Sequence, residues 1–274
     1  MRRTTTLFAA AGLAAAASLA AAPGASAADE AQLSVFHAVP DTTVDVYVNG
    51  ELTLDDFTPG SMAGPLSLPA GSYELAITAP DAADASAPII GPVTADLTAG
   101  GNFTAVANLS ADGTPTANLY TNDMSMIEAG KSHLTVRHVA AAPAVDVLAN
   151  GAPVITSLVN PEEKTLTVDA GTISASVAAA GTTEPVIGPA DLTLPEGVHT
   201  IVYAWGSLED GNLALATQTV EGMESAPNAV PGALPAAQDN NAGVMLAAAG
   251  GLTLMALAGT AVAARRRSTA PSAE

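Results

Sequence analysis

Apolar and polar residues alternate in short stretches of this chain, and one such stretch occurs twice. In VDVYV (residues 44–48) the valines fall on one face of an extended strand, whereas Asp45 and Tyr47 fall on the other. VDVLA (residues 145–149) repeats the pattern at an offset of 101 residues. Each stretch is followed by Asn-Gly, the dipeptide that favours a two-residue hairpin turn with positive φ. The pattern therefore predicts two equivalent β-hairpins.

The similarity extends well beyond these hairpins. Residues 33–50 align with residues 134–151 at one constant offset, and PIIGP (88–92) aligns with PVIGP (185–189) after small deletions. One further deletion places Phe103-Thr104 on His199-Thr200. Self-similarity of this kind predicts two copies of one domain.

Each copy contains seven or eight short strand-like segments separated by turn residues, and neither shows a helical period. This pattern over roughly 90 residues is typical of an antiparallel β-sandwich of the Ig-like kind. The expected fold class is all-β, with a helical signal segment at the N-terminus and one transmembrane helix near the C-terminus. We expect a signal peptide (1–27), a first sandwich (33–122), a linker (123–133), a second sandwich (134–220), a Pro-containing stalk (221–241), a transmembrane helix (242–264) and a basic cytoplasmic tail (265–274).

Both ends of the chain carry targeting features. Arg2 and Arg3 precede an apolar run that finishes on Ala25-Ser26-Ala27, the pattern of a secretory signal peptide. Near the other end, residues 242–264 carry no charge and are followed by three arginines, which hold that side in the cytoplasm. We expect a single-pass protein of the cell membrane with its N-terminal domains extracellular. Processing by a sortase is the alternative, although residues 234–238 lack the Thr-Gly of a sorting motif.

The charge of the chain is strongly negative, and its distribution excludes one class of partner. The chain has 27 Asp and Glu against eight Lys and Arg, and only Lys131, Arg137 and Lys164 fall in the predicted exported part. Such a surface repels nucleic acid and attracts cations. The chain has no cysteine, so no disulfide supports the fold in an oxidising compartment.

A histidine and an aspartate recur in both copies. If the strands that carry them are neighbours, the aspartate can accept a hydrogen bond from the imidazole or from the loop between the two residues. We expect this pair to tether the loop, raising the pKa of the histidine and lowering that of the aspartate. The structural motif consists of His37, Asp45, Asn49 and Gly50 in the first copy and His138, Asp146, Asn150 and Gly151 in the second.

The alternative for the His-Asp pair is a fragment of a catalytic or metal site. The chain has no Gly-x-Ser-x-Gly, no cysteine and no His-Glu-x-x-His to complete such a group, so we expect no enzymatic activity, no catalytic residue and no cofactor. The four histidines, including His133 and His199, lack zinc-ligand spacing.

Two other groups of residues have a structural and a functional interpretation. The acidic pairs Asp55-Asp56 and Glu162-Glu163 and the acidic segment 209–212 read as solvated turns, with weak calcium binding as the alternative. Trp205, the one tryptophan of the chain, is expected to close a sandwich core.

The His-Asp stretch with its Asn-Gly turn, and the glycine-containing strand that follows it, resemble a bacterial extracellular family known as domain of unknown function 4397. Its members show H-x-x-P before VDVYV-x-G and then L-x-A-G-x-Y. The first copy carries these positions, whereas the second has Ala141 for the proline and Ile173 for the tyrosine. The resemblance implies a secreted or surface β-sandwich and brings no established activity. The residues that match are His37, Pro40, Asp45, Gly50, Gly71 and Tyr73 in the first copy and His138, Asp146, Gly151 and Gly171 in the second.

Together these features predict a non-enzymatic cell-surface protein. Two β-sandwich domains are displayed on a membrane anchor for adhesion, envelope organisation or ligand binding, and the partner is an unknown surface or envelope ligand. The alternative is an extracellular receptor module that depends on calcium or on a small ligand. A hydrolase of envelope material is the third interpretation.

Overall fold

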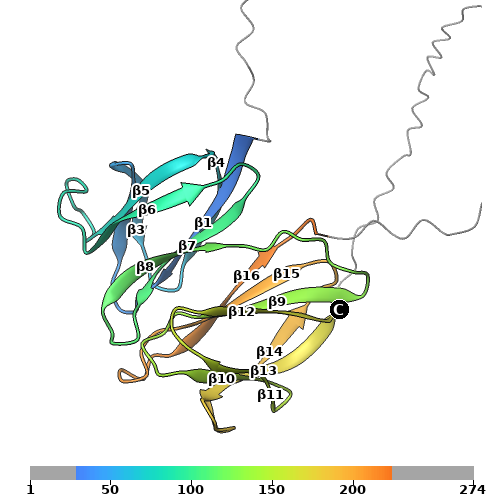
Figure 1. The fold of residues 1–274 in the computed structure, drawn as a ribbon. Coiled ribbons are helices and arrows are strands. Elements are labelled where there is room, and N and C mark those ends of the chain that lie inside the picture. Colours follow the sequence, from blue (N-terminus) through green and yellow to red (C-terminus); the bar gives the residue numbers. More distant parts are fainter. Residues whose placement is uncertain (1–28, 224–274) are drawn as a thin grey trace, which may run out of the picture. The chain divides into compact units, whose positions relative to one another are not determined.

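The computed structural model describes residues 29–223, and these residues lie within one compact unit. The predicted signal peptide, transmembrane helix and tail, together with most of the predicted stalk, lie outside the described residues. In the part that is described, no helix is both long enough and apolar enough to cross a membrane. All named elements are strands, which confirms the predicted all-β class (Figure 1).

The first eight strands form two four-stranded sheets, which we call the first sheet pair. One sheet has the order β4-β1-β7-β8 and the other has the order β3-β2-β5-β6. The strands are β1 (Glu30–Ala38), β2 (Val44–Val48), β3 (Glu51–Phe57), β4 (Met62–Pro69), β5 (Gly71–Thr78), β6 (Ile90–Leu97), β7 (Asn102–Leu109) and β8 (Pro115–Thr121).

The next eight strands form a second sheet pair with the same order. Its sheets are β12-β9-β15-β16 and β11-β10-β13-β14, so each strand occupies the place of the strand eight positions earlier. The strands are β9 (Lys131–His138), β10 (Val145–Ala149), β11 (Ala152–Leu158), β12 (Glu163–Asp169), β13 (Gly171–Ala179), β14 (Pro185–Leu194), β15 (His199–Trp205) and β16 (Ala214–Val220).

One strand pairing in each sheet pair differs from the antiparallel arrangement that the sequence predicts. β1 pairs with β7 in parallel, and β9 pairs with β15 in parallel. The reason is topological, because β7 enters its sheet after the chain has crossed over from β6 of the opposite sheet. The expectation of a purely antiparallel sandwich is therefore wrong at this pairing.

The register of these parallel strands also corrects the sequence alignment. Gln32 lies opposite Asn102, and His133 lies opposite His199. His199 therefore takes the place of Asn102, and the alignment that set Phe103 on His199 is shifted by one residue. A shift of one residue matters in a strand because it moves every side chain to the other face.

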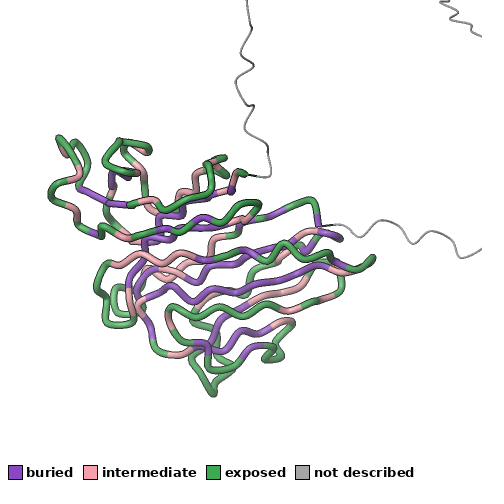
Figure 2. Tube along the Cα trace, turned by 45° about the horizontal axis from the view of Figure 1, so that its top comes forward, coloured by how far each residue is buried: buried purple, intermediate pink, exposed green. Residues whose placement is uncertain are grey.

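Apolar side chains fill the space between the two sheets of each pair. In the first pair Val44 and Val46 pack with Ile77 and Ile90, and in the second pair Val145 and Val147 pack in the same way. Figure 2 shows how buried residues follow the strands in the interior while the loops between them are exposed. The alternation read from the sequence thus identifies the inward faces of β2 and β10.

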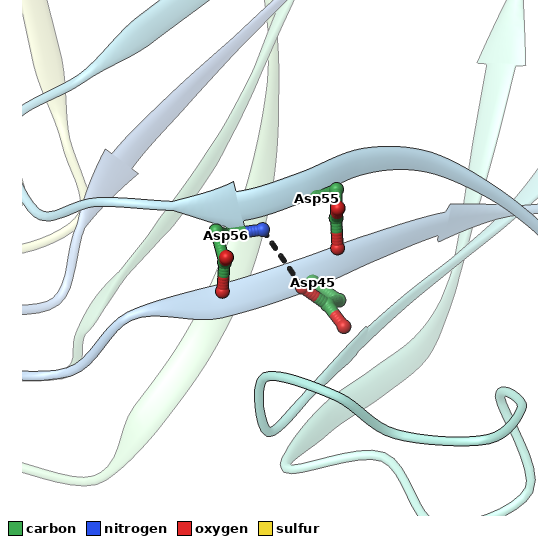
Figure 3. Close-up of side chains that lie close together, drawn as sticks. All are labelled: Asp45, Asp55 and Asp56. Carbon is green, nitrogen blue, oxygen red and sulfur yellow. Dashed lines mark hydrogen bonds between the residues drawn. The ribbon is translucent and has the colours of Figure 1, made fainter.

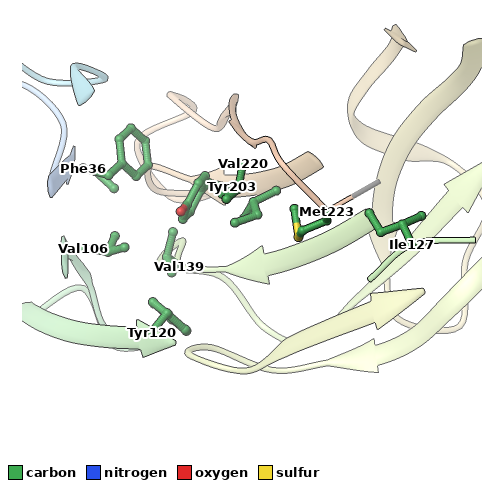
Figure 4. Packing of buried hydrophobic residues seen from close by; sticks show 10 residues of the cluster. Phe36, Val106, Tyr120, Ile127, Val139, Tyr203, Val220 and Met223 are labelled. Carbon is green, nitrogen blue, oxygen red and sulfur yellow. The ribbon is translucent and has the colours of Figure 1, made fainter. Parts of the chain in front are cut away.

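A further apolar cluster lies between the two sheet pairs, and we call it the joint (Figure 4). It forms because the outer face of β1, β7 and β8 meets the outer face of β9, β15 and β16. Its buried members are Phe36, Ala38, Val106, Tyr120, Ile127, Val139, Ile201, Tyr203, Val220 and Met223.

Three expectations change at the joint. The segment expected to be a linker is packed, since Ile127 is buried and its N–H donates to the carbonyl of Met223 at 2.7 Å. Met223, expected in the stalk, is itself buried. Trp205 does not close a sandwich core. On β15, Trp205 lies on the same face as Tyr203 and on the opposite face from Val202. It therefore packs against Phe36 at the joint.

Candidate functional site

The two Asn-Gly hairpins have the geometry that the sequence predicts. Asn49 and Gly50 have φ values of 51° and 81°, and Asn150 and Gly151 have 51° and 79°, so both turn residues are left-handed. The Oδ1 atom of Asn49 also accepts a hydrogen bond from the N–H of Glu74 at 2.8 Å. Each asparagine thus sets the turn and extends the pairing of its strand with the neighbouring strand.

The repeated histidines hold the loops that follow β1 and β9. Nε2 of His37 donates to the carbonyl of Thr42 at 2.6 Å, and Nε2 of His138 donates to the carbonyl of Pro143 at 3.0 Å. Burial lowers the pKa of both imidazoles, and the bond to the carbonyl opposes this effect only in part. The expectation that the pKa of these histidines is raised is therefore wrong.

The repeated aspartates bind a different part of the backbone. Oδ1 of Asp45 accepts the N–H of Asp56 at 2.9 Å, and Oδ1 of Asp146 accepts the N–H of Ser157 at 2.8 Å. No hydrogen bond between His37 and Asp45 is found among the described residues. The two lie in opposite sheets, because β1 and β2 belong to different sheets. The predicted pairing of His37 with Asp45 is therefore wrong, although the two residues are close in sequence.

Three aspartates meet at the edge of the first sheet pair, and we call them the acidic cluster (Figure 3). Carboxylate oxygens of Asp45, Asp55 and Asp56 all lie within 4.8 Å of one another. Asp45 is buried, whereas Asp55 and Asp56 are exposed. Partial desolvation, and then the charges of Asp45, Asp56 and Asp81, raise the pKa of Asp55. The three carboxylates therefore form a small region of concentrated negative charge.

The local backbone brings these carboxylates together. Asp55 and Asp56 belong to strand β3 and not to a turn, so the expected turn is wrong. The register of β3 against β2 is irregular here, and Asp56 has a φ of 50°. Such a bulge gives two residues of β3 room opposite one residue of β2, and it directs both acids toward Asp45.

The second sheet pair lacks this cluster. The positions that correspond to the three aspartates hold Asp146, Thr156 and Ser157, as the pairing of β10 with β11 shows. Asp146 is the member that both pairs share, so the buried carboxylate has a role in the fold and the two added acids are particular to the first pair. Among residues 29–223 the acidic cluster is the one group of three or more side chains spaced to hold a metal ion.

A polar network spans the joint, and its centre is Arg137. Its guanidinium donates from Nε to Glu163 at 2.7 Å, from one terminal nitrogen to the hydroxyl of Tyr203 at 2.7 Å, and from the other to Oδ1 of Asn122 at 2.8 Å. It also lies 4.3 Å from the centre of the Tyr120 ring. The sequence offered one signal, a single arginine on an alternating strand of the predicted exported part, but its partners come from far apart in the chain.

His133 and His199 lie side by side at one end of the joint. Nδ1 of His199 donates to the carbonyl of Asp123 at 3.0 Å, and Nε2 accepts from Thr135 at 2.7 Å. The ring of His133 lies edge-on to the ring of His199, with 5.8 Å between the ring centres. Both nitrogens of His199 are thus used in hydrogen bonds, one to the segment between the two sheet pairs and one to β9.

Comparison with known proteins identifies the first part of the chain. The family model described as "Domain of unknown function (DUF4397)" matches residues 31–148. Residues 31–148 are thus similar to the DUF4397 family. The DUF4397 match covers the first sheet pair and continues into β10, and it confirms the resemblance predicted from the sequence motifs. A search of curated proteins returned no match.

Proposed function

We propose that this DUF4397 protein is a non-enzymatic cell-surface protein that displays two Ig-like β-sandwich domains on a membrane anchor. The two domains are the two sheet pairs, and their identical strand order supports an origin by duplication. The sequence supplies the export signal in residues 1–27 and the anchor in residues 242–264. Adhesion, envelope organisation or the binding of an envelope ligand is the role we infer for such a pair.

One observation carries the non-enzymatic part of this proposal. The conspicuous repeated polar residues are all used to hold main chain: His37 and His138 bind loop carbonyls, and Asp45 and Asp146 bind backbone amides. A catalytic imidazole must be free to take up a proton from a reacting group. The imidazoles of His37 and His138 are 1% and 0% exposed, and each holds a loop carbonyl through Nε2, so a reacting group in the solvent does not reach them.

The proposal is tested by the position of the protein in its own cell. An epitope tag inserted in the exposed turn 208–211 should be accessible to antibody on intact cells, whereas the same tag after residue 274 should be accessible only after lysis. Deletion of residues 242–274 should release the protein into the medium. Equal labelling of both tags on intact cells, or a deleted form that stays in the cytosol, would overturn the proposal.

The same experiment distinguishes the sortase alternative. A protein held by its own transmembrane helix is extracted by detergent, whereas a protein joined covalently to the wall is released only by digestion of the wall. We expect detergent to be sufficient.

The calcium-dependent receptor module is the second candidate function. The acidic cluster is the observation that favours it, because calcium prefers carboxylate and other oxygen ligands.

A further inference from the structure

The strands at the sheet edges differ in whether another strand can pair with them. Edge strands are commonly protected by proline, by charge or by a bulge. Proline occurs in β4, β6, β8 and β14, and β3 and β11 each contain a left-handed residue where their register shifts. β12 has charged residues at both ends. β16 has none of these features, since ALATQTV holds no proline and no charge and pairs with β15 in an unbroken register.

The hydrogen-bond pattern shows which backbone groups of β16 point away from its sheet. The N–H of Val139 donates to the carbonyl of Ala204, so the even-numbered residues of β15 turn their backbone groups toward β9. The odd-numbered residues of β15 therefore turn toward β16 and bond to the even-numbered residues there. The odd-numbered residues of β16 point their N–H and C=O groups outward, and no partner for these groups is found within residues 29–223. These positions are Leu215, Thr217 and Thr219, followed by Glu221 beyond the end of the strand.

A groove of about 660 Å³ lies along this edge, and we call it the edge groove. One wall consists of the consecutive residues 217–221. Consecutive residues of a strand alternate between the two faces of a sheet, so the groove borders the edge of β16 rather than one face. The opposite wall includes Ser34 of β1 and Met62 of β4. Figure 1 shows β16 at the margin of its sheet.

The side chains of the edge groove offer polar groups and one negative charge. Gln218 is 8% exposed, and its Oε1 atom accepts hydrogen bonds from Tyr203 and Thr104, whereas no acceptor for its Nε2 atom is found among the described residues. Glu221 is the charged residue of the lining. A ligand of this groove is therefore neutral or basic, and it supplies backbone groups to an open strand edge.

Two occupants from the protein itself fit this edge poorly. The segment that follows the described residues carries Pro227, Pro231 and Pro235, and proline lacks the N–H that a strand ladder requires. A second copy of the chain brings the same excess of acidic residues, so like charges oppose its approach. A segment of a different protein remains.

We propose that the edge groove binds an extended segment of another envelope protein, which adds to β16 as a further antiparallel strand. This addition extends the sheet β12-β9-β15-β16 and satisfies the outward backbone groups. Residues of the segment opposite Gln218 and Val220 lie on the same face as these residues, toward Met62, and are apolar. Residues opposite Thr217 and Thr219 are small and polar, and a lysine or arginine lies opposite Glu221. The inference rests on the proposed function, because it names the class of ligand that the displayed domains bind.

The test uses the purified full-length chain in detergent and a capped seven-residue peptide, a lysine followed by alternating valine and threonine. Antiparallel pairing places the lysine opposite Glu221 and the valines opposite Val220, Gln218 and Ala216. Fluorescence anisotropy of the labelled peptide should show saturable binding of one peptide per chain. Hydrogen exchange should slow at the amides of Thr217 and Thr219. The fully N-methylated peptide, which keeps the side chains and lacks every N–H, should not bind.

Thr219→Pro removes an outward N–H without touching a bond to β15, and it should weaken peptide binding about fivefold or more. The control is Thr167→Pro. Thr167 is also exposed on an edge strand, and its backbone groups point outward because the N–H of His138 donates to the carbonyl of Glu162 and the pairing alternates from there. This variant should bind the peptide as the wild type does.

Glu221→Lys provides a second variant that leaves the ladder intact. It should weaken binding of the lysine peptide about two- to fivefold, and a peptide that begins with glutamate should recover this loss.

Absence of saturable binding, equal binding of the N-methylated peptide, or equal loss in Thr219→Pro and Thr167→Pro would overturn the proposal. Exchange at β16 that slows with rising protein concentration in the absence of peptide would also overturn it, because a second copy would then occupy the groove. Failure here would leave the display function intact, because that function is tested by location in the cell.

Discussion

Replacing Arg137 by methionine tests whether the joint holds the two sheet pairs together. Methionine fills much of the same volume, but it removes the three hydrogen bonds that the guanidinium makes to Glu163, Tyr203 and Asn122. Arg137 is 1% exposed, so water does not replace these bonds without opening the joint. The variant therefore separates the polar contribution of the joint from its packing.

The expected magnitude follows from burial. Removing one partner of a buried ion pair costs roughly 3–5 kcal/mol. The side chain of Glu163 is 35% exposed and can be hydrated once its partner is gone, and the hydroxyl of Tyr203 keeps its bond to Gln218. We therefore expect a loss at the lower end, about 3 kcal/mol of the free energy of unfolding.

Urea unfolding of the full-length chain gives the measurement. Trp205 is the one tryptophan of the chain and lies at the joint, so its fluorescence reports on the joint, whereas circular dichroism reports on all the strands. In the wild type the two signals should change together. In Arg137→Met the fluorescence transition should move to lower urea. Lys131→Met is the control, because the pair Lys131–Asp169 is exposed and contributes little. A loss below about 1 kcal/mol in Arg137→Met, or a loss no larger than in the control, would refute this account of the joint.

Three further predictions concern the repeated motif and the buried histidines. Asn49→Ala should reduce the free energy of unfolding in urea by about 1–2 kcal/mol, because alanine is strained in the left-handed region and the hydrogen bond to Glu74 is lost. Asn49→Gly should cost less, because glycine adopts this φ without strain. An equal loss in both variants would contradict the role of φ. Asp146→Asn should reduce the free energy of unfolding by about 1–3 kcal/mol, since the amide NH₂ faces one of the two backbone donors that the carboxylate binds. An unchanged urea midpoint would contradict a stabilising role for these two hydrogen bonds. Burial lowers the pKa of His37, His138 and His199, so the unfolded chain takes up protons at a higher pH than the folded chain does. Stability should therefore be full above about pH 6.5 and fall as the pH drops below it, and His138→Gln should flatten this dependence of the melting temperature; a wild type that melts at the same temperature across this range would disprove it.

Local sequence determined the strands, the hairpins and the resemblance of residues 31–148 to the DUF4397 family. The alternation of valines in residues 44–48 and 145–149 fixed the inward faces, and Asn-Gly fixed the turns, because φ preferences and side-chain period act between residues that are adjacent in the chain. The repeated motifs were also sufficient for the resemblance that the family match confirms. Asp55 and Asp56 were visible as acids, but the sequence placed them in a turn.

Tertiary structure alone decided which distant residues meet. His37 and Asp45 are close in sequence and lie in opposite sheets, whereas Arg137 finds Asn122 and Tyr203 across a joint that no local pattern announces. The charge of Asp81 acts on Asp55 because β5 returns beside β2, and the place of Trp205 depends on which face of β15 the register turns outward. Pairing and burial of this kind minimise the free energy of the whole chain, so they depend on contacts between residues far apart in sequence and not on any short stretch of it.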